Sequence, residues 1–116
     1  MPDSNNRRSV HKIILRPSQN ANSPRRTAWL WHQDASFHKT YNDITIWIPL
    51  CKCGRDSPGL EFLNVPKLRK VFEVDKDQYN SIKADLQIFL ESKYERYAPE
   101  YNIGDCVVFN SYAIHR

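Results

Sequence analysis

The sequence predicts a mainly β protein, built either as a jelly-roll-like double sheet or as a barrel. Three observations indicate this class: several short apolar runs are separated by turn residues, one stretch alone has helical periodicity, and strands do not alternate with helices. The 116 residues suffice for one modest domain with a single hydrophobic core. Its 41% hydrophobic and 26% charged residues exclude collagen-like and wholly disordered classes.

The positive charge is concentrated at the start of the chain. Residues 1–26 carry six Lys or Arg and one acidic residue, a charge of +5, whereas residues 27–116 carry eleven and twelve, a charge of −1. We therefore expect a basic polar leader over residues 1–26, with one short strand at 10–15, and a β domain over residues 27–116. The leader has no aromatic residue on which a base could stack, so a solvated segment is favoured over nucleic-acid binding.

Cellular location is inferred from apolar runs and from cysteines. The longest apolar run, 44–51, is far shorter than the roughly 20 residues that a bilayer span requires, and the polar start lacks the apolar region of a signal peptide. The chain has three cysteines, an odd number, and Cys51 and Cys53 are too close for an ordinary bridge. We expect no membrane association, reduced thiols and a cytoplasmic location.

The first half of the β domain holds two expected strands. Residues 27–34 are rich in aromatic residues and end in a polar turn. Residues 43–50 alternate with a period of two, and Pro49 indicates an edge strand or a strand end. One face of this second run carries Ile44, Ile46, Ile48 and Leu50, and the other carries Thr45, Trp47 and Pro49.

The second half is expected to contain two further strands and one helix. Residues 60–65 form an apolar run closed by a proline. Residues 75–97 have apolar side chains near the 3.6-residue period, and Asp75 with Gln78 resembles a capping box, so this stretch predicts a helix. After a turn at Gly104 and Asp105, residues 106–115 form the last expected strand. If its pairing is regular, alternate residues share one face: Val107, Phe109, Ser111, Ala113 and His115.

Two histidines and one carboxylate are the sharpest candidate site. His32 and Asp34 are two residues apart on an expected strand and therefore point the same way, and a neighbouring strand carries His115. This ligand set can hold Fe(II) on one face and leave positions open for a bidentate co-substrate and dioxygen. The alternative is a pair of surface polar residues at a strand end, because His-x-Asp alone is a weak signal.

A zinc site is a second candidate. Cys51 and Cys53 together with Cys106 or His38 could in principle supply its ligands. The Cys-x-Cys spacing lacks a matching second pair, so thiols lining a turn are favoured.

Five short segments surround the candidate metal ligands in a characteristic order and spacing. They are Trp-His-Gln-Asp at 31–34, Thr-Ile-Trp-Ile-Pro-Leu at 45–50, Ser-Pro-Gly-Leu-Glu-Phe-Leu-Asn-Val-Pro at 57–66, Gly-Asp-Cys-Val-Val-Phe at 104–109 and Ile-His-Arg at 114–116. Over about residues 28–116 the chain resembles the phytanoyl-CoA dioxygenase-like branch of the iron(II)/2-oxoglutarate-dependent oxygenases.

The resemblance implies a double-stranded β-helix (jelly roll), incomplete at the C-terminus and with one inserted helix. It implies that His32, Asp34 and His115 bind Fe(II), and that Gln33 and Trp47 line the pocket of the co-substrate 2-oxoglutarate. The implied reaction is hydroxylation of a small or medium organic substrate by dioxygen, coupled to oxidative decarboxylation of 2-oxoglutarate. Because Asp34 is a carboxylate rather than a small residue, hydroxylation is implied rather than halogenation.

One part of the family pattern is absent from the sequence. The resemblance places the cation that pairs with the far carboxylate of 2-oxoglutarate on the strand after the distal histidine, beyond Arg116. Arg116 directly follows His115, so its side chain should point to the other face. We expect a fragment of a longer protein or a degenerate copy, with weak or lost 2-oxoglutarate binding and an open sheet edge that favours self-association. The alternative function is a catalytically inactive jelly-roll remnant that acts as a binding or interaction module.

Overall fold

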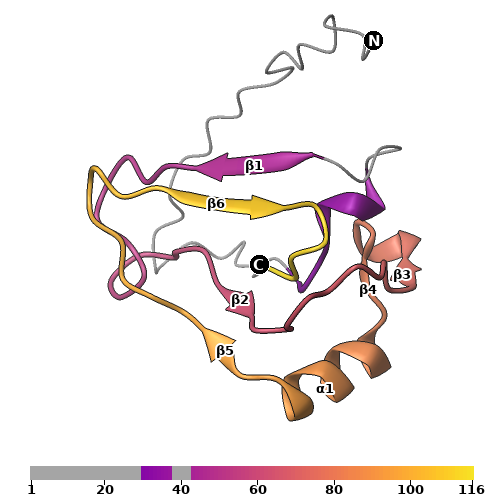
Figure 1. Ribbon diagram of the computed structural model, residues 1–116. Helices are drawn as coiled ribbons and strands as arrows, with labels where there is room; N and C mark the ends of the chain where they lie inside the picture. The colour runs from indigo at the N-terminus through magenta and orange to yellow at the C-terminus, as the bar shows by residue number, and fades with distance from the viewer. Residues whose placement is uncertain (1–29, 38–42) are drawn as a thin grey trace, which may run out of the picture.

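The computed structural model describes residues 30–37 and 43–116 of the chain (Figure 1). Its helices and strands are, in order, η1 (Asp34–Ser36), β1 (Ile44–Trp47), β2 (Phe62–Leu63), β3 (Val74–Asp75), η2 (Lys76–Gln78), β4 (Ser81–Ile82), α1 (Ala84–Lys93), β5 (Arg96–Tyr97) and β6 (Val107–Asn110). The expected β-rich class with one α-helix is confirmed, and the described residues form antiparallel strand pairs rather than a closed barrel. The leader expected at 1–26 and its strand at 10–15 lie outside the described residues.

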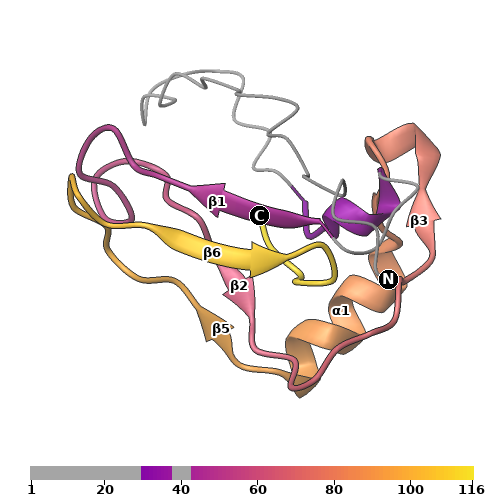
Figure 2. The same cartoon turned by 45° about the horizontal axis from the view of Figure 1, so that its top comes forward.

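The strands form two layers. β1 pairs with β6, β2 with β5 and β3 with β4. Isolated antiparallel bridges place His115 between His32 on one side and Phe62 of β2 on the other. A hydrogen bond of 2.9 Å from the Ile82 backbone nitrogen to the Trp31 oxygen adds β4 beside the His32 segment. This broader layer therefore runs from β3 to β5, and Figure 2 shows the β1–β6 pair lying across from β2 and β5.

Side chains alternate between the two faces of the broader layer. One face packs against α1 and forms the hydrophobic core, whose members are Trp31, Leu63, Ile82, Leu90 and Ile114. The intervening residues His32, Phe62 and His115 point to the opposite face, since successive strand residues project to opposite sides. On that face Phe62 meets Phe109 of β6, with ring centroids 5.1 Å apart.

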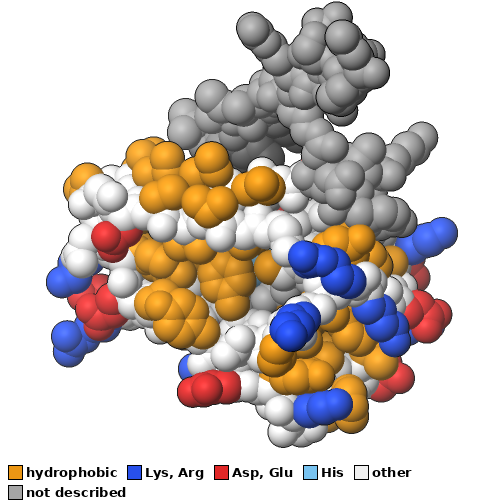
Figure 3. All heavy atoms as spheres, viewed as in Figure 1, with side chains coloured by type: hydrophobic (Ala, Val, Ile, Leu, Met, Phe, Trp, Pro, Cys, Tyr) orange, Lys and Arg blue, Asp and Glu red, His pale blue; other side chains and the backbone are white. Residues whose placement is uncertain are grey.

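The alternation expected for residues 43–50 is confirmed in β1. Its isoleucine face is the exposed one, with Ile44 68% and Ile46 61% exposed, and Figure 3 shows the resulting apolar surface at the top of the molecule. Thr45 and Trp47 lie on the other, half-buried face. The strand ends at Trp47, two residues before Pro49, as expected for a residue that cannot donate to a ladder.

The helix expected over residues 75–97 is wrong in extent, because α1 covers Ala84–Lys93 alone. Asp75 does act as a cap, but of the short helix η2, where its side chain accepts a hydrogen bond from the Asp77 nitrogen. Tyr79 and Asn80 then adopt left-handed conformations with φ of 54° and 55°, which cannot continue a right-handed helix. The flanking residues instead pair as β3 with β4 and as β5 with β2.

The strand expected at 106–115 is also wrong as a single regular element. β6 ends at Asn110, and a turn follows in which the Ala113 nitrogen donates to the Asn110 oxygen at 3.2 Å. The turn moves the chain from the β1–β6 pair to the broader layer, so His115 bridges His32 and Phe62. The turn before β6 is confirmed: Gly104 has φ of 100°, and the Asp105 carboxylate accepts from the Asn102 nitrogen at 2.7 Å.

Two other expected strands are shorter than the sequence indicated. The run at 60–65 contributes only the two residues of β2. In the run at 27–34, of which 30–34 are described, the chain makes a single bridge at His32 and then turns into η1. Within the described residues, no helix is long and apolar enough to cross a membrane.

Replacing Leu90 by Ala should lower the free energy of unfolding by about 2–5 kcal/mol, because Leu90 is buried among Trp31, Leu63 and Ile114 and truncation leaves a cavity. The matched control is Ile88→Ala on the same helix, where the side chain is 70% exposed. We expect a change within about 0.5 kcal/mol for this control. Urea unfolding followed by circular dichroism measures both, and equal effects of the two variants would contradict the packing described.

Candidate metal centre

Three side chains with metal-ligand chemistry lie together on the face of the broader layer that looks toward β6. His32, Asp34 and His115 each offer one ligand atom, and these atoms all lie within 4.8 Å of one another. The two imidazole rings are 4.3 Å apart, and Asp34 Oδ1 is 3.5 Å from His115 Nε2. The sequence predicted this set, and the structure brings all three members together.

Backbone hydrogen bonds fix the two histidines relative to each other. The His32 nitrogen donates to the His115 oxygen, and the His115 nitrogen donates to the His32 oxygen, both at 3.0 Å. Asp34 begins η1, which is held to the turn after β6 by a 2.9 Å bond from the Ala35 nitrogen to the Ser111 oxygen. Segments from both ends of the described chain therefore converge on one point.

The side-chain hydrogen bonds of the histidines set their tautomers. His32 Nδ1 lies 3.0 Å from the Leu30 carbonyl oxygen, and His115 Nδ1 lies 3.0 Å from the Ala113 carbonyl oxygen. A carbonyl oxygen only accepts, so Nδ1 carries a proton in each ring, and Nε2 is the nitrogen left to bind a metal. A neutral imidazole whose Nδ1–H is held by a carbonyl is the usual metal-binding form of histidine.

The donor set fits a first-row divalent ion such as Fe(II). It combines two imidazole nitrogens with one carboxylate, the combination found in facial 2-His-1-carboxylate sites. The Asp34 side chain is 21% exposed, and its Oδ2 accepts a 2.8 Å hydrogen bond from Thr45 Oγ1. The carboxylate is thus held in place by β1.

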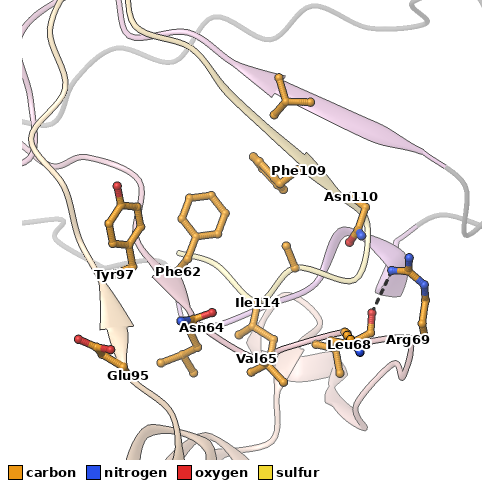
Figure 4. A pocket seen from close by; sticks show the side chains of 14 residues that line it. Phe62, Asn64, Val65, Leu68, Arg69, Glu95, Tyr97, Phe109, Asn110 and Ile114 are labelled. Atoms are coloured by element: carbon orange, nitrogen blue, oxygen red, sulfur yellow. Dashed lines mark hydrogen bonds between the residues drawn. The ribbon is translucent and has the colours of Figure 1, made fainter.

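A pocket of about 650 Å³ lies between β6 and the β2–β5 pair (Figure 4). Phe62 and Phe109 line it, and both rings also pack against His115, with centroid distances of 6.0 and 4.7 Å. The remaining wall mixes apolar side chains with charged and amide groups, which are Asn64, Lys67, Arg69, Glu95 and Asn110. The pocket therefore adjoins one of the candidate ligands, His115, through two aromatic rings.

Gln33 has a structural task that sequence reasoning missed. The side chain is fully buried, and its Nε2 donates to the backbone oxygens of Lys70 and Tyr112 while its Oε1 accepts from the Phe72 nitrogen, each at 2.8 Å. Gln33 lies between His32 and Asp34, and successive residues of a strand point to opposite faces. The sequence therefore already indicated that the Gln33 side chain points away from the two candidate ligands. Its expected contact with the co-substrate stays a prediction.

Trp47 lies on the inner face of β1, where its ring is 4.8 Å from that of Tyr101. Tyr101 is 4% exposed and donates its hydroxyl to the Leu60 oxygen at 2.8 Å. Burial, which is the largest cause, together with the nearby Tyr97, Cys53 and Glu61 raises the pKa of Tyr101 to about 12. The co-substrate contact expected for Trp47 stays a prediction.

Arg116 points away from the candidate metal ligands, as the sequence indicated. Its guanidinium lies 4.2 Å from the centroid of the Trp31 ring, and its Nε is 2.7 Å from Glu61 Oε2. A second carboxylate, Glu91 Oε1, lies 3.6 Å from Nη1. The guanidinium is therefore engaged on the core face of the layer.

The cysteines form no comparable cluster among the described residues. Cys51 and Cys106 are exposed, Cys53 is buried, and all three are free thiols. Burial, with a smaller contribution from Cys51, raises the pKa of the Cys53 thiol, which opposes formation of the metal-binding thiolate. His38, the other expected zinc ligand, lies outside the described residues.

The fold and the site together define a β-rich protein with a two-histidine, one-carboxylate centre. The model of the phytanoyl-CoA dioxygenase (PhyH) family matches residues 5–116. The chain therefore belongs to the phytanoyl-CoA dioxygenase family and carries a domain of the iron(II)/2-oxoglutarate oxygenase type. The match is longer than the resemblance over about 28–116 that the motifs gave, and it includes most of residues 1–26. No curated protein and no solved structure matches the chain.

The raised pKa of Tyr101 makes stability depend on pH in the alkaline range. Its folded pKa of about 12 exceeds the ordinary tyrosine value, so the stabilisation is complete below about pH 10 and is lost as the pH rises toward 12. Urea unfolding at several pH values should show a steeper alkaline loss of stability for the wild-type chain than for Tyr101→Phe. Parallel losses in the two proteins would contradict the assignment.

Proposed function

We propose that the chain is a non-haem iron(II)/2-oxoglutarate-dependent dioxygenase domain, a hydroxylase of a small or medium organic substrate, in which His32, Asp34 and His115 hold the iron. The observation that carries this proposal is the convergence of the three ligand atoms within 4.8 Å. The Nδ1 hydrogen bonds of both histidines and membership of the PhyH family support it.

Iron bound at this site would supply the redox chemistry by which dioxygen hydroxylates the substrate while 2-oxoglutarate is oxidatively decarboxylated. The protein's own side chains would bind the ion and hold it in place. His32 and His115 present neutral nitrogens, and Asp34 adds one negative charge to balance the cation. Phe62 and Phe109 pack against His115 and also line the neighbouring pocket.

The pocket beside the centre is the proposed place of the organic substrate. Its wall combines aromatic and aliphatic side chains with amide and charged groups, which could bind and orient an organic substrate that carries polar groups. We further propose that Trp47, on the inner face of β1, lines the pocket of the co-substrate 2-oxoglutarate. For Gln33 we propose a supporting role, because its amide holds the backbone at Lys70, Phe72 and Tyr112.

The same proposal includes a partial double-stranded β-helix over residues 27–116, preceded by a polar leader over 1–26. Support comes from two facing antiparallel layers whose inner faces carry the candidate ligands and the aromatic rings. A cytoplasmic location is supported by the three free thiols.

The second candidate function is a catalytically inactive jelly-roll remnant that binds a partner. Among the described residues β1 pairs with β6 alone, which leaves an edge where a second copy of the chain could add a strand.

Replacing Asp34 by Ala should strongly weaken anaerobic Fe(II) binding, because it removes the anionic ligand. The loss should exceed the roughly 10–100-fold that is typical when a residue hydrogen-bonded to a metal ligand is replaced. Asp85→Ala, an exposed carboxylate in the first turn of α1, is the matched control and should leave the affinity unchanged. Isothermal titration calorimetry measures both, and equal affinities of Asp34→Ala and the wild type would contradict the site.

Adding 2-oxoglutarate to the Fe(II)-loaded chain separates the two candidate functions. A visible charge-transfer band is expected for the dioxygenase. Tight Fe(II) binding without any 2-oxoglutarate binding would instead favour the inactive remnant.

A further inference from the structure

Thr45 links the β1–β6 pair to the candidate metal centre. Its Oγ1 donates to Asp34 Oδ2 at 2.8 Å, and the two residues come from different layers. The other carboxylate oxygen, Oδ1, is the one that lies 3.5 Å from His115 Nε2. The two oxygens of Asp34 therefore have different environments, one facing a hydroxyl of β1 and one facing the ligand histidine.

The cross-strand partner of Thr45 contacts a second candidate ligand. Thr45 is paired with Phe109 in the β1–β6 register, and the Phe109 ring is 4.7 Å from the His115 ring. The backbone closes the arrangement, since the Ser111 nitrogen donates to the Asp43 oxygen and the Ala35 nitrogen donates to the Ser111 oxygen. One rung of the β1–β6 ladder thus contacts two of the three ligand side chains.

We propose that Thr45 is a positioning residue of the metal centre, which holds Oδ2 of Asp34 by a hydrogen bond and so presents Oδ1 to the ion. This inference rests on the proposed function, because it requires a metal at His32, Asp34 and His115. A carboxylate accepts only, so the Thr45 hydroxyl must be the donor. Threonine is stiff at χ1, and its place on a paired strand fixes the direction of that donation.

Physical chemistry gives this contact a defined effect on metal binding. A carboxylate without a fixed partner can rotate and can bind an ion through either oxygen or through both. A hydrogen bond to one oxygen removes this freedom before the metal arrives, so less entropy is lost on binding. Loss of the hydroxyl should therefore reduce metal affinity while leaving every ligand atom in the chain.

The test compares Co(II) affinity in the 116-residue chain with and without the hydroxyl. Thr45→Val removes the hydroxyl and keeps the branched shape that suits β1, and we expect about 10–100-fold weaker Co(II) binding. Thr45→Ser keeps the hydroxyl and should retain most of the wild-type affinity. The matched control is Ser57→Ala, which removes a hydroxyl that donates to the Lys52 oxygen away from the site and should change nothing.

A second reading of the same samples separates positioning from general stability. The visible spectrum of bound Co(II) reports its coordination, and it should change in Thr45→Val but not in Thr45→Ser or Ser57→Ala. The proposal would be overturned if Thr45→Ser bound Co(II) as weakly as Thr45→Val and the spectrum of Thr45→Val were unchanged from that of the wild type.

The outcomes distinguish this inference from the function on which it rests. If the wild-type chain binds no Co(II), both fail. If it binds Co(II) and Thr45→Val binds equally well, the positioning role alone is overturned. Should Thr45→Val not fold by circular dichroism, proton NMR of the Co(II)-loaded wild type decides. A hyperfine-shifted Thr45 hydroxyl proton that disappears in D₂O is expected, and its absence would overturn the proposal.

Discussion

The reciprocal backbone bridge between His32 and His115 is the constraint on which the rest of the site depends. It aligns the two imidazoles on one face of the broader layer, and the same alternation sends Trp31 and Ile114 to the core on the other face. A shift of one residue in the pairing register of these segments would turn the histidines toward the core and the core residues away from it. Burial of the core and alignment of the candidate ligands are therefore one event, so the stability of the layer maintains the geometry of the site.

The second layer completes the centre from the opposite side. β1 exposes its isoleucine face and turns Thr45 and Trp47 inward, which reverses the usual rule that the apolar face of a strand is the buried one. The inward face is the one that holds Asp34 and, through Phe109 of the paired strand, contacts His115. Thr45 is inside because it contacts the Asp34 carboxylate, whereas Trp47 packs against Tyr101.

Much of this arrangement could be predicted from the sequence, and the errors have physical causes. Period-two alternation identified β1, the Gly-Asp pair identified the turn before β6, and the motifs identified the three candidate ligands. The helix was extended too far because its periodicity continues through Tyr79 and Asn80, whose left-handed conformations depend on strand pairing that no local pattern encodes. The turn that moves the chain from β6 to His115 is likewise a tertiary feature, as are the backbone partners of Gln33.

The central claim, that one ion is shared by His32, Asp34 and His115, is tested most directly by anomalous diffraction from crystals of the chain grown with Co(II). The account predicts one anomalous peak about 2.0–2.2 Å from Nε2 of both histidines and from a carboxylate oxygen of Asp34, the range of first-row metal–ligand bonds. A fully loaded crystal whose peaks all lie elsewhere, for instance at the exposed cysteines, would contradict it.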